Sequence, residues 1–220
     1  MKKYEIVSLG LNCLPRTVLT RGGVKPRKAD GELSCPFDLV AHPIETILKC
    51  LETNFEGYFD DLHFKLRKRN FLDFRKQGVW QKKDGTKFFH DKDCKQNDME
   101  KLVNRIKNRI YNFNSIIAIN KPVIFVMAIY SETNCIDKIF KELKRLRGDK
   151  PFKLLILDYG NNLNLQNKEI EVLKILLPDE KFIKIWNKTG YVKSKLGCYI
   201  EKMVCSFVKS NAEMMLKQED

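Results

Sequence analysis

The sequence lacks the features that would tie it to a membrane, a metal site or a nucleotide-binding loop. No apolar run reaches the roughly 18 residues that a transmembrane helix needs, and the apolar stretch after Met1-Lys2-Lys3 is too short for a signal peptide. No Cys-x-x-Cys pair occurs, and no Cys/His cluster has the spacing of a zinc site. Walker and G-x-G-x-x-G motifs are both missing. These absences predict a cytoplasmic protein that uses neither a metal nor a cofactor.

Histidine is scarce, and the cysteines form no framework. The chain has seven cysteines, an odd number at irregular spacings, which favours reduced thiols in a reducing compartment over disulfides. It has three histidines. Any chemistry that pairs a thiol with an imidazole base therefore has few candidate bases, namely His42, His63 and His90.

Positive charge is plentiful, with a net charge of +13 and a sequence pI near 9.4. Such a charge attracts polyanions. The lysines are nevertheless spread along the chain, and the one dense basic run, Lys65–Arg69, is typical of a solvated face. Because no helix-turn-helix, RNP-type or finger motif accompanies it, the sequence does not favour nucleic-acid binding. The substrate and the oligomeric state are left open.

The pattern of apolar residues predicts one α/β domain over residues 1–220. Short apolar runs at 5–9, 122–129, 153–157 and 181–186 are typical of buried strands. Between and after them lie stretches with helical spacing, at 44–55, 99–113, 136–146, 170–177 and 196–216. This alternation predicts a three-layer fold with a mostly parallel sheet and helices on both faces, of Rossmann-like or SGNH-like topology.

Residues 57–98 break this pattern and read as an irregular insertion over one edge of the sheet. Aromatic and charged residues alternate here, and Lys83-Asp84-Gly85 predicts a turn. A hairpin is expected around it, with Val79–Gln81 as one strand and Thr86–Phe89 as the other. Insertions of this kind often carry functional loops.

Ligands bind beyond the carboxyl ends of the strands in a parallel sheet, and Cys13 lies at such an end. It follows Gly10 and Asn12, in the expected first turn of a helix. Backbone N–H groups and the helix dipole there could lower the pKa of the thiol and hold an oxyanion. The alternative is an ordinary buried thiol. The Gly160-Asn161-Asn162 run, after a later strand, is either an oxyanion donor or a simple turn.

His90 is the most suggestive base, because Asp91 follows it directly. The alternative is a surface histidine at a strand end. His42 reads as a loop residue, and His63 is adequately explained by packing. Asp38 could orient a base or, as is commoner for such a residue, cap a turn. Asp158 has the same two interpretations.

These residues carry a family resemblance. The order Ser8–Cys13 (SLGLNC), then Pro36–Leu39 (PFDL), then Phe89-His90-Asp91 resembles an uncharacterised family named for papain-like cysteine peptidases. Its members usually have S-L-G-x-x-C, P-F-D-W and H-D, followed by an arginine-containing helix and an apolar strand. Leu39 stands here where the family usually has Trp. The resemblance extends from residue 5 to about residue 190.

The resemblance implies a cysteine-dependent peptidase with Cys13 as nucleophile, His90 as base, and Asp38 or Asp91 as the orienting acid. A papain-like fold would place the cysteine on a long helix against an antiparallel barrel, whereas the strand pattern predicts a parallel sheet. A fainter resemblance is to SGNH hydrolases, which place a nucleophile after the first strand and an Asn in a Gly-x-Asn turn, here Gly160–Asn162. Those enzymes take their His from near the C-terminus, and none follows His90.

Two functions from different classes follow. The leading hypothesis is a cysteine-dependent hydrolase or acyl-transfer enzyme in which Cys13 attacks a carbonyl and His90 moves the proton. Backbone N–H groups after Gly10 and the side chains of Asn12 and Asn161 are the candidate oxyanion or ligand-binding groups. The alternative is a non-catalytic or transferase-associated α/β module that binds an anionic ligand such as a nucleotide or sugar phosphate.

Overall fold

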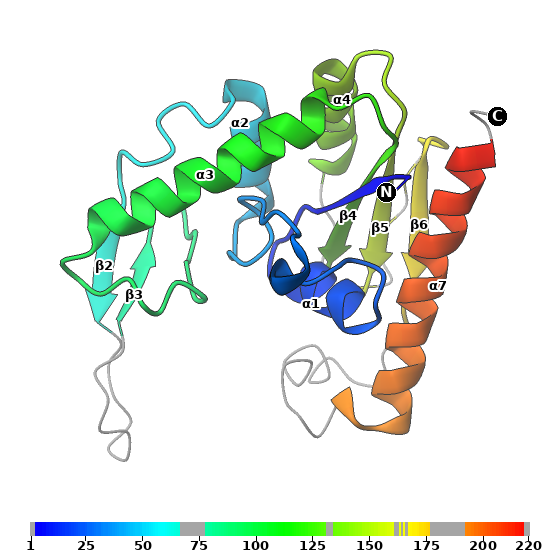
Figure 1. Ribbon diagram of the computed structural model, residues 1–220, viewed down its shortest axis with the longest axis horizontal. Coiled ribbons are helices and arrows are strands. Elements are labelled where there is room, and N and C mark those ends of the chain that lie inside the picture. The colour runs from blue at the N-terminus through cyan, green and yellow to red at the C-terminus, as the bar shows by residue number, and fades with distance from the viewer. Residues whose placement is uncertain are drawn as a thin grey trace.

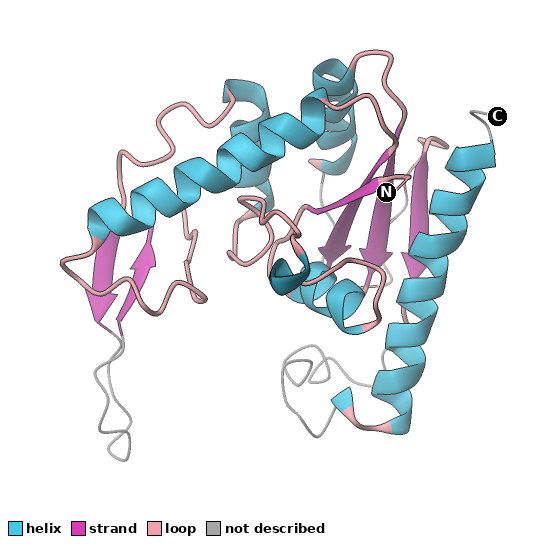
Figure 2. Ribbon diagram, viewed as in Figure 1, coloured by secondary structure: helices cyan, strands magenta, loops and turns pink. Residues whose placement is uncertain are grey.

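A parallel sheet of four strands lies at the centre of the computed structural model (Figures 1 and 2). Its strands run in the order β1 (Glu5–Ser8), β4 (Val123–Ile129), β5 (Phe152–Asp158) and β6 (Ile170–Lys174). Each neighbouring pair is parallel. The structure describes residues 3–66, 78–130, 134–160, 163, 165, 167–176 and 192–217.

The central strands are apolar because both of their faces are covered. Every residue of β4 is buried, as are five of the seven in β5. Successive side chains point to opposite faces of the sheet. Phe125 and Met127 therefore join the hydrophobic cluster on one face, while Val126 and Ala128 join the cluster on the other. Two-sided burial explains the uninterrupted apolar sequence of β4.

Helices cover both faces of the sheet. One face packs on α1 (Leu14–Arg21) and α7 (Lys195–Lys217). The opposite face packs on α2 (Ile44–Thr53), α3 (Met99–Ala118) and α4 (Ile136–Arg147). A short 3-10 turn, η1 (Lys28–Asp30), lies in the loop after α1. The expected mixed α/β fold, with a parallel sheet flanked by helices, is confirmed.

The insertion contains a small antiparallel sheet, and the predicted hairpin forms in part, as a short antiparallel pairing whose second side is not a full strand. Strand β3 (Gly78–Gln81) pairs with β2 (His63–Leu66), where Phe64 lies opposite Trp80 and their rings are 5.3 Å apart. The predicted turn forms, with Gly85 at φ +97°. The segment after the turn, however, makes only isolated bridges, from Lys87 to Gln81 and from Lys87 to Ala41. In Figure 1, α3 extends from this small sheet toward α4.

Another expectation is corrected in the C-terminal part. Residues 170–177 read as a short helix, but Ile170–Lys174 is strand β6, which pairs with β5 along five residues. The strand expected at 181–186 lies outside the described residues. In the described part of the chain no helix combines the length and the apolar character that a membrane crossing requires.

Candidate active site

A tight turn after β1 delivers Cys13 to the start of α1. Cys13 is the N-cap of the helix, and Pro15 occupies its first turn, where the missing N–H of proline costs nothing. Gly10 makes the turn possible. A Cβ at this position would lie 2.0 Å from the carbonyl oxygen of Asn12 and 3.0 Å from that of Phe37. Any other residue would displace the backbone that leads into Cys13.

The side chain of Asn12 holds this turn in place. Its Oδ1 accepts a hydrogen bond from the Leu14 N–H at 2.8 Å, which satisfies one of the free donors of the helix N-terminus. Its Nδ2 donates to the Tyr130 hydroxyl at 3.0 Å, and the Tyr130 ring stacks on Tyr159 at 5.5 Å. The loop before Cys13 is thus tied to the end of β4.

The Cys13 thiol is protonated at neutral pH in this environment. Burial raises its pKa, and hydrogen bonds from Thr17 and from the backbone offset only part of that increase. The lowered pKa expected from the helix N-terminus is therefore not found. Burial also raises the pKa of Tyr130 to about 12, and a charge on Cys13 would add to that increase, so the hydroxyl stays protonated.

Cys13 and His90 line the same cavity, whose volume is about 410 Å³. Cys13 comes from the β1–α1 turn, and His90 comes from the insertion. The remaining walls come from the Pro-Phe-Asp corner, from β3 and from the loop that follows His90, and they are formed by Asn12, Leu39, Val40, Ala41, Gly78, Val79, Trp80, Phe88, Phe89, Asp91, Lys92 and Cys94.

His90 is a neutral imidazole at pH 7. Burial lowers its pKa, and the nearby positive charges of Lys92 and Arg109 add to this effect, against an opposing contribution from Asp91. No hydrogen bond joins the ring to the Cys13 sulfur in the described part of the chain. The two groups thus line one cavity without a hydrogen bond between them, and each is in the protonation state that a thiol and its base need before reaction.

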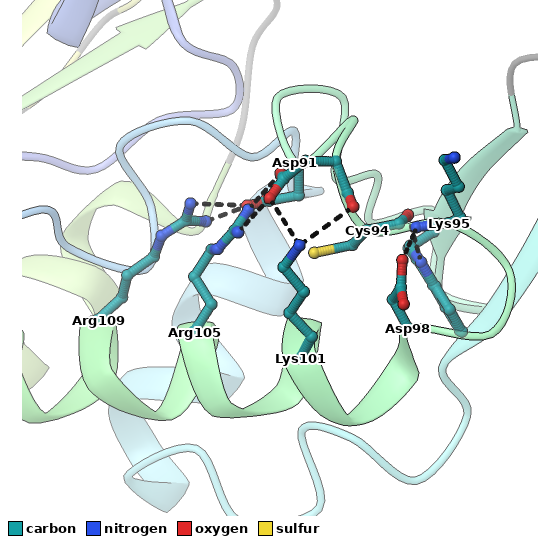
Figure 3. Close-up of polar contacts among 9 residues, drawn as sticks. Asp91, Cys94, Lys95, Asp98, Lys101, Arg105 and Arg109 are labelled. Carbon is teal, nitrogen blue, oxygen red and sulfur yellow. Dashed lines mark hydrogen bonds and ion pairs between the residues drawn. The ribbon is translucent and has the colours of Figure 1, made fainter.

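Asp91 is bound to two arginines of α3 rather than to a histidine (Figure 3). Its side chain is 2% exposed and accepts hydrogen bonds from Arg105 at 2.9 Å and from Arg109 at 2.8 and 3.1 Å. Arg105 also holds Asp93, at 2.6 and 2.7 Å. The two arginines lie four residues apart and so share one face of α3. They clamp the segment that presents His90.

Further bonds hold this segment against β3. The Cys94 N–H donates to the Asp91 carbonyl at 3.0 Å, and the indole N–H of Trp80 donates to the Cys94 carbonyl at 3.0 Å. Trp80 is 4% exposed, so its indole donor would be costly to leave unpaired. The loop after His90 is therefore fixed to β3 and to α3.

Asp38 caps its own corner. Its Oδ2 accepts a hydrogen bond from the Cys35 N–H at 2.8 Å and lies 3.7 Å from Arg16. Phe37, in the same corner, is fully buried among aromatic rings. The Pro-Phe-Asp sequence therefore anchors the wall of the cavity that begins at Leu39.

The other predicted residues lie elsewhere. His42 lies in a loop, as predicted, but it is buried in the core. Its Nε2 lies 2.6 Å from the Tyr58 hydroxyl, and burial lowers its pKa to about 3. His63 is exposed on β2, beside Gln81. Asp158 caps a turn, since it accepts the N–H groups of Gly160 and Leu163. Asn161 and Asn162 lie outside the described residues.

Sequence reasoning did not single out Tyr130, Trp80 or the two arginines. Arg105 and Arg109 carried a usable signal, because their spacing of four places both on one face of the helix. Tyr130 directly follows β4, at the edge of the sheet where ligands are expected. The partners of these side chains lie 12 to 118 residues away, and no local pattern shows such contacts.

No curated protein and no solved structure matches the chain. The family model described as "Putative papain-like cysteine peptidase (DUF1796)" matches residues 4–147, from the start of the sheet to the end of α4. The matched segment contains Cys13, Asp38, His90 and Asp91. Since the match covers well over half of the chain, the protein belongs to this family.

Proposed function

We propose that the protein is a cysteine-dependent hydrolase that cleaves an amide or related acyl bond, with Cys13 as nucleophile and His90 as general base. The observation that carries the proposal is the shared cavity, which is lined by both groups and by no other histidine of the described chain. Family membership supports a peptidase at the level of the family.

The reaction follows from the protonation states of the two groups. Neutral His90 takes the proton of the Cys13 thiol as the sulfur attacks the carbonyl carbon of the substrate. The C–N bond of the tetrahedral adduct then breaks, and His90 gives the proton to the departing amine. A thioester remains on Cys13. Water attacks it while His90 takes a proton from the water, and the sulfur leaves and regains that proton.

The resting geometry is compatible with this sequence of steps. Catalytic hydrogen bonds are often long before substrate binds and shorten in the complex. A substrate that displaces water from the cavity would also strengthen the electrostatic attraction between the thiolate and the imidazolium that form during attack. The Cys13–His90 contact would then form only when the carbonyl is in place.

Two groups beside Cys13 suit a developing oxyanion. The Asn12 Nδ2 group donates one hydrogen to Tyr130 and has a second, and Asn12 lines the cavity. The backbone N–H of Cys13 lies at the N-terminus of α1, where the helix dipole favours negative charge. Gly10 gives both groups the space that the turn requires. Asn161 stays a candidate from the sequence.

The two acids have distinct proposed roles. Asp91 would be a positioning residue that fixes His90 through Arg105 and Arg109, since its oxygens already receive those bonds. Asp38 would position the wall of the cavity at Leu39.

Three features stay predictions: a single domain over residues 1–220, a Rossmann-like or SGNH-like topology, and a cytoplasmic location. All seven cysteines are free thiols, which supports the last of these.

Cleavage of a mixed peptide library, followed by mass spectrometry, tests the proposal. We expect the wild-type protein to cleave a subset of peptides. Cys13→Ala should abolish the cleavage, and His90→Gln should slow it by about 10²–10⁴. The matched control is Cys198→Ala, which removes an exposed thiol of α7 and should change nothing. A wild-type protein that cleaves no peptide, or a fully active Cys13→Ala variant, would contradict the proposal.

A further inference from the structure

A second cavity, of about 540 Å³, lies along the flank of α1 next to the candidate active site. Leu39 lines both cavities, so they meet at one side chain. Thr17 lines the second cavity and donates a hydrogen bond from its Oγ1 to the Cys13 carbonyl at 2.7 Å. The second cavity is therefore a neighbour of the one that holds Cys13, and we call it the arginine groove.

The arginine groove is lined by cations and hydroxyls. Its walls are Arg16, Thr17, Thr20, Arg21, Arg27 and Leu39, and none of these residues is acidic. Guanidinium groups bind carboxylates through paired hydrogen bonds, and each can offer five donors. The composition of these walls is that of a site for a negatively charged group.

The donors of the groove are only partly used by acids behind it. Arg21 binds Glu201 through Nε and Nη2, which leaves its Nη1 group available. Arg27 lies 3.9 Å from Asp30, and both side chains are largely exposed, so this pair is weak. The pairs that exist neutralise part of the positive charge without filling the groove.

Arg16 adds a buried positive charge to this wall and forms ion pairs with two buried carboxylates. It is 7% exposed, yet its Nη1 makes no hydrogen bond to any described residue. The nearest carboxylates are those of Asp38 at 3.7 Å and Glu32 at 3.9 Å, both beyond hydrogen-bond length. The Thr20 hydroxyl is likewise buried without a partner. Both of these atoms are shielded from solvent, so the donors that a ligand in the groove would reach are those of the more exposed Arg21 and Arg27.

We propose that the arginine groove is a substrate subsite for an acidic side chain, so that the enzyme acts on peptides that carry a carboxylate close to the scissile bond. This inference rests on the proposed function. The helix rises about 1.5 Å per residue, so Thr17 lies about 6 Å along α1 from Cys13. An extended peptide covers that distance in about two residues. The acidic residue would therefore lie two to three positions from the attacked carbonyl.

Paired alkylating peptides test the proposal. The probes are iodoacetyl-glycyl-glutamyl-amide and its neutral glutaminyl counterpart, and mass spectrometry measures the alkylation rate at each cysteine. The readout is the ratio of the glutamyl to the glutaminyl rate. At Cys13 we expect a ratio of about 10 at low salt, as one charge-assisted contact would give. Exposed Cys198, on the same chain, gives the reference ratio for a thiol that does not adjoin the groove.

Arg27→Gln is the clearest variant, because this side chain is exposed and its ion pair is weak. It should lower the Cys13 ratio by about threefold, and Arg21→Gln should lower it as well. Lys141→Gln removes one exposed charge from α4, on the opposite face of the sheet, and should leave the ratio unchanged. A Cys13 ratio equal to that at Cys198, or one unaffected by Arg27→Gln and Arg21→Gln, would overturn the subsite.

The failure of the subsite can be separated from the failure of the proposed function. The rate with the neutral probe reports the reactivity of Cys13 alone, whereas the ratio reports the groove. Calorimetric binding of acetyl-glycyl-glutamyl-amide to Cys13→Ala needs no reactive thiol. The glutamyl peptide should bind this variant about tenfold more tightly than the glutaminyl peptide does. Equal affinities in this variant would overturn the subsite even if Cys13 proved inert.

Discussion

Asp91, the residue after His90, receives hydrogen bonds from both terminal nitrogens of Arg109, at 2.8 and 3.1 Å. A carboxylate next to a histidine in sequence would ordinarily be suspected of orienting its ring. Here the carboxylate instead fastens the backbone beside the histidine to α3. The placement of the candidate base therefore depends on a buried ion pair that reaches 18 residues along the chain.

Arg109→Ala should destabilise the protein by about 3 kcal/mol, because it leaves a buried carboxylate with fewer partners. Urea unfolding monitored by circular dichroism measures the loss. Lys101→Ala is the matched control on the same helix, since its pair with Asp93 is solvent-exposed and should matter little. A loss below about 1 kcal/mol for Arg109→Ala would mean that the clamp does not hold the segment.

The alkylation of Cys13 should have a pH midpoint above the roughly 8.5 of a free thiol. Burial disfavours the thiolate, so the pKa is raised and the rate at neutral pH stays low. Thr17→Val removes a hydrogen bond that lowers this pKa and should move the midpoint further upward. Iodoacetamide labelling resolved by cysteine measures the profile.

The control for that substitution is Thr53→Val. Like Thr17, Thr53 donates its hydroxyl to a carbonyl four residues earlier, but it lies on α2, away from any effect on the Cys13 thiol. It should leave the Cys13 profile unchanged. A Cys13 midpoint below 8 would mean that the helix N-terminus outweighs burial, as the sequence alone suggested.

Stability should fall in acid because of His42. Its pKa is about 3 in the folded protein and roughly 6.5 when unfolded, so the unfolded state binds the proton first. The contribution of neutral His42 to the free energy of unfolding is fully present above pH 6.5 and is lost as the pH falls toward 3. The slope from this group approaches about 1.4 kcal/mol per pH unit within that window.

His42→Gln should flatten this part of the profile, since glutamine does not titrate. Urea midpoints between pH 7.5 and pH 4.5 provide the comparison, and His63→Gln, at an exposed site on β2, is the control. If the wild-type protein and His42→Gln lose stability in parallel, His42 is not the group that is protonated.

The sheet could be predicted from the sequence because burial leaves a local mark. Uninterrupted apolar runs such as that of β4 occur where both faces are covered. Ile170–Lys174 is too short for periodicity to distinguish a helix from a strand, and pairing with β5 decided the outcome. The prediction for the small antiparallel sheet was incomplete for a different reason. The turn at Gly85 is local chemistry, whereas the pairing of β2 with β3 joins segments separated by residues 67–77.

The candidate site was predictable in part. The position of Cys13 after a strand, and the order of the Cys, Pro-Phe-Asp and His-Asp motifs, singled out Cys13 and His90. The sequence did not show that both line one cavity. The pKa direction of Cys13 was not predictable, because the helix terminus is a local feature while burial depends on the whole fold. His42 shows the same limit. Its partner Tyr58 follows 16 residues later, and no spacing rule connects them.

The acylation of Cys13 by p-nitrophenyl acetate, followed in a single turnover, tests the central claim most directly. Release of p-nitrophenolate gives the rate, and mass spectrometry locates the acetyl group. We predict a thioester at Cys13 that forms about 10²-fold or more slowly in His90→Gln, whereas His63→Gln reacts as the wild-type protein does. Acetylation that avoids Cys13, or that proceeds at an unchanged rate in His90→Gln, would contradict a reaction carried out by these two residues.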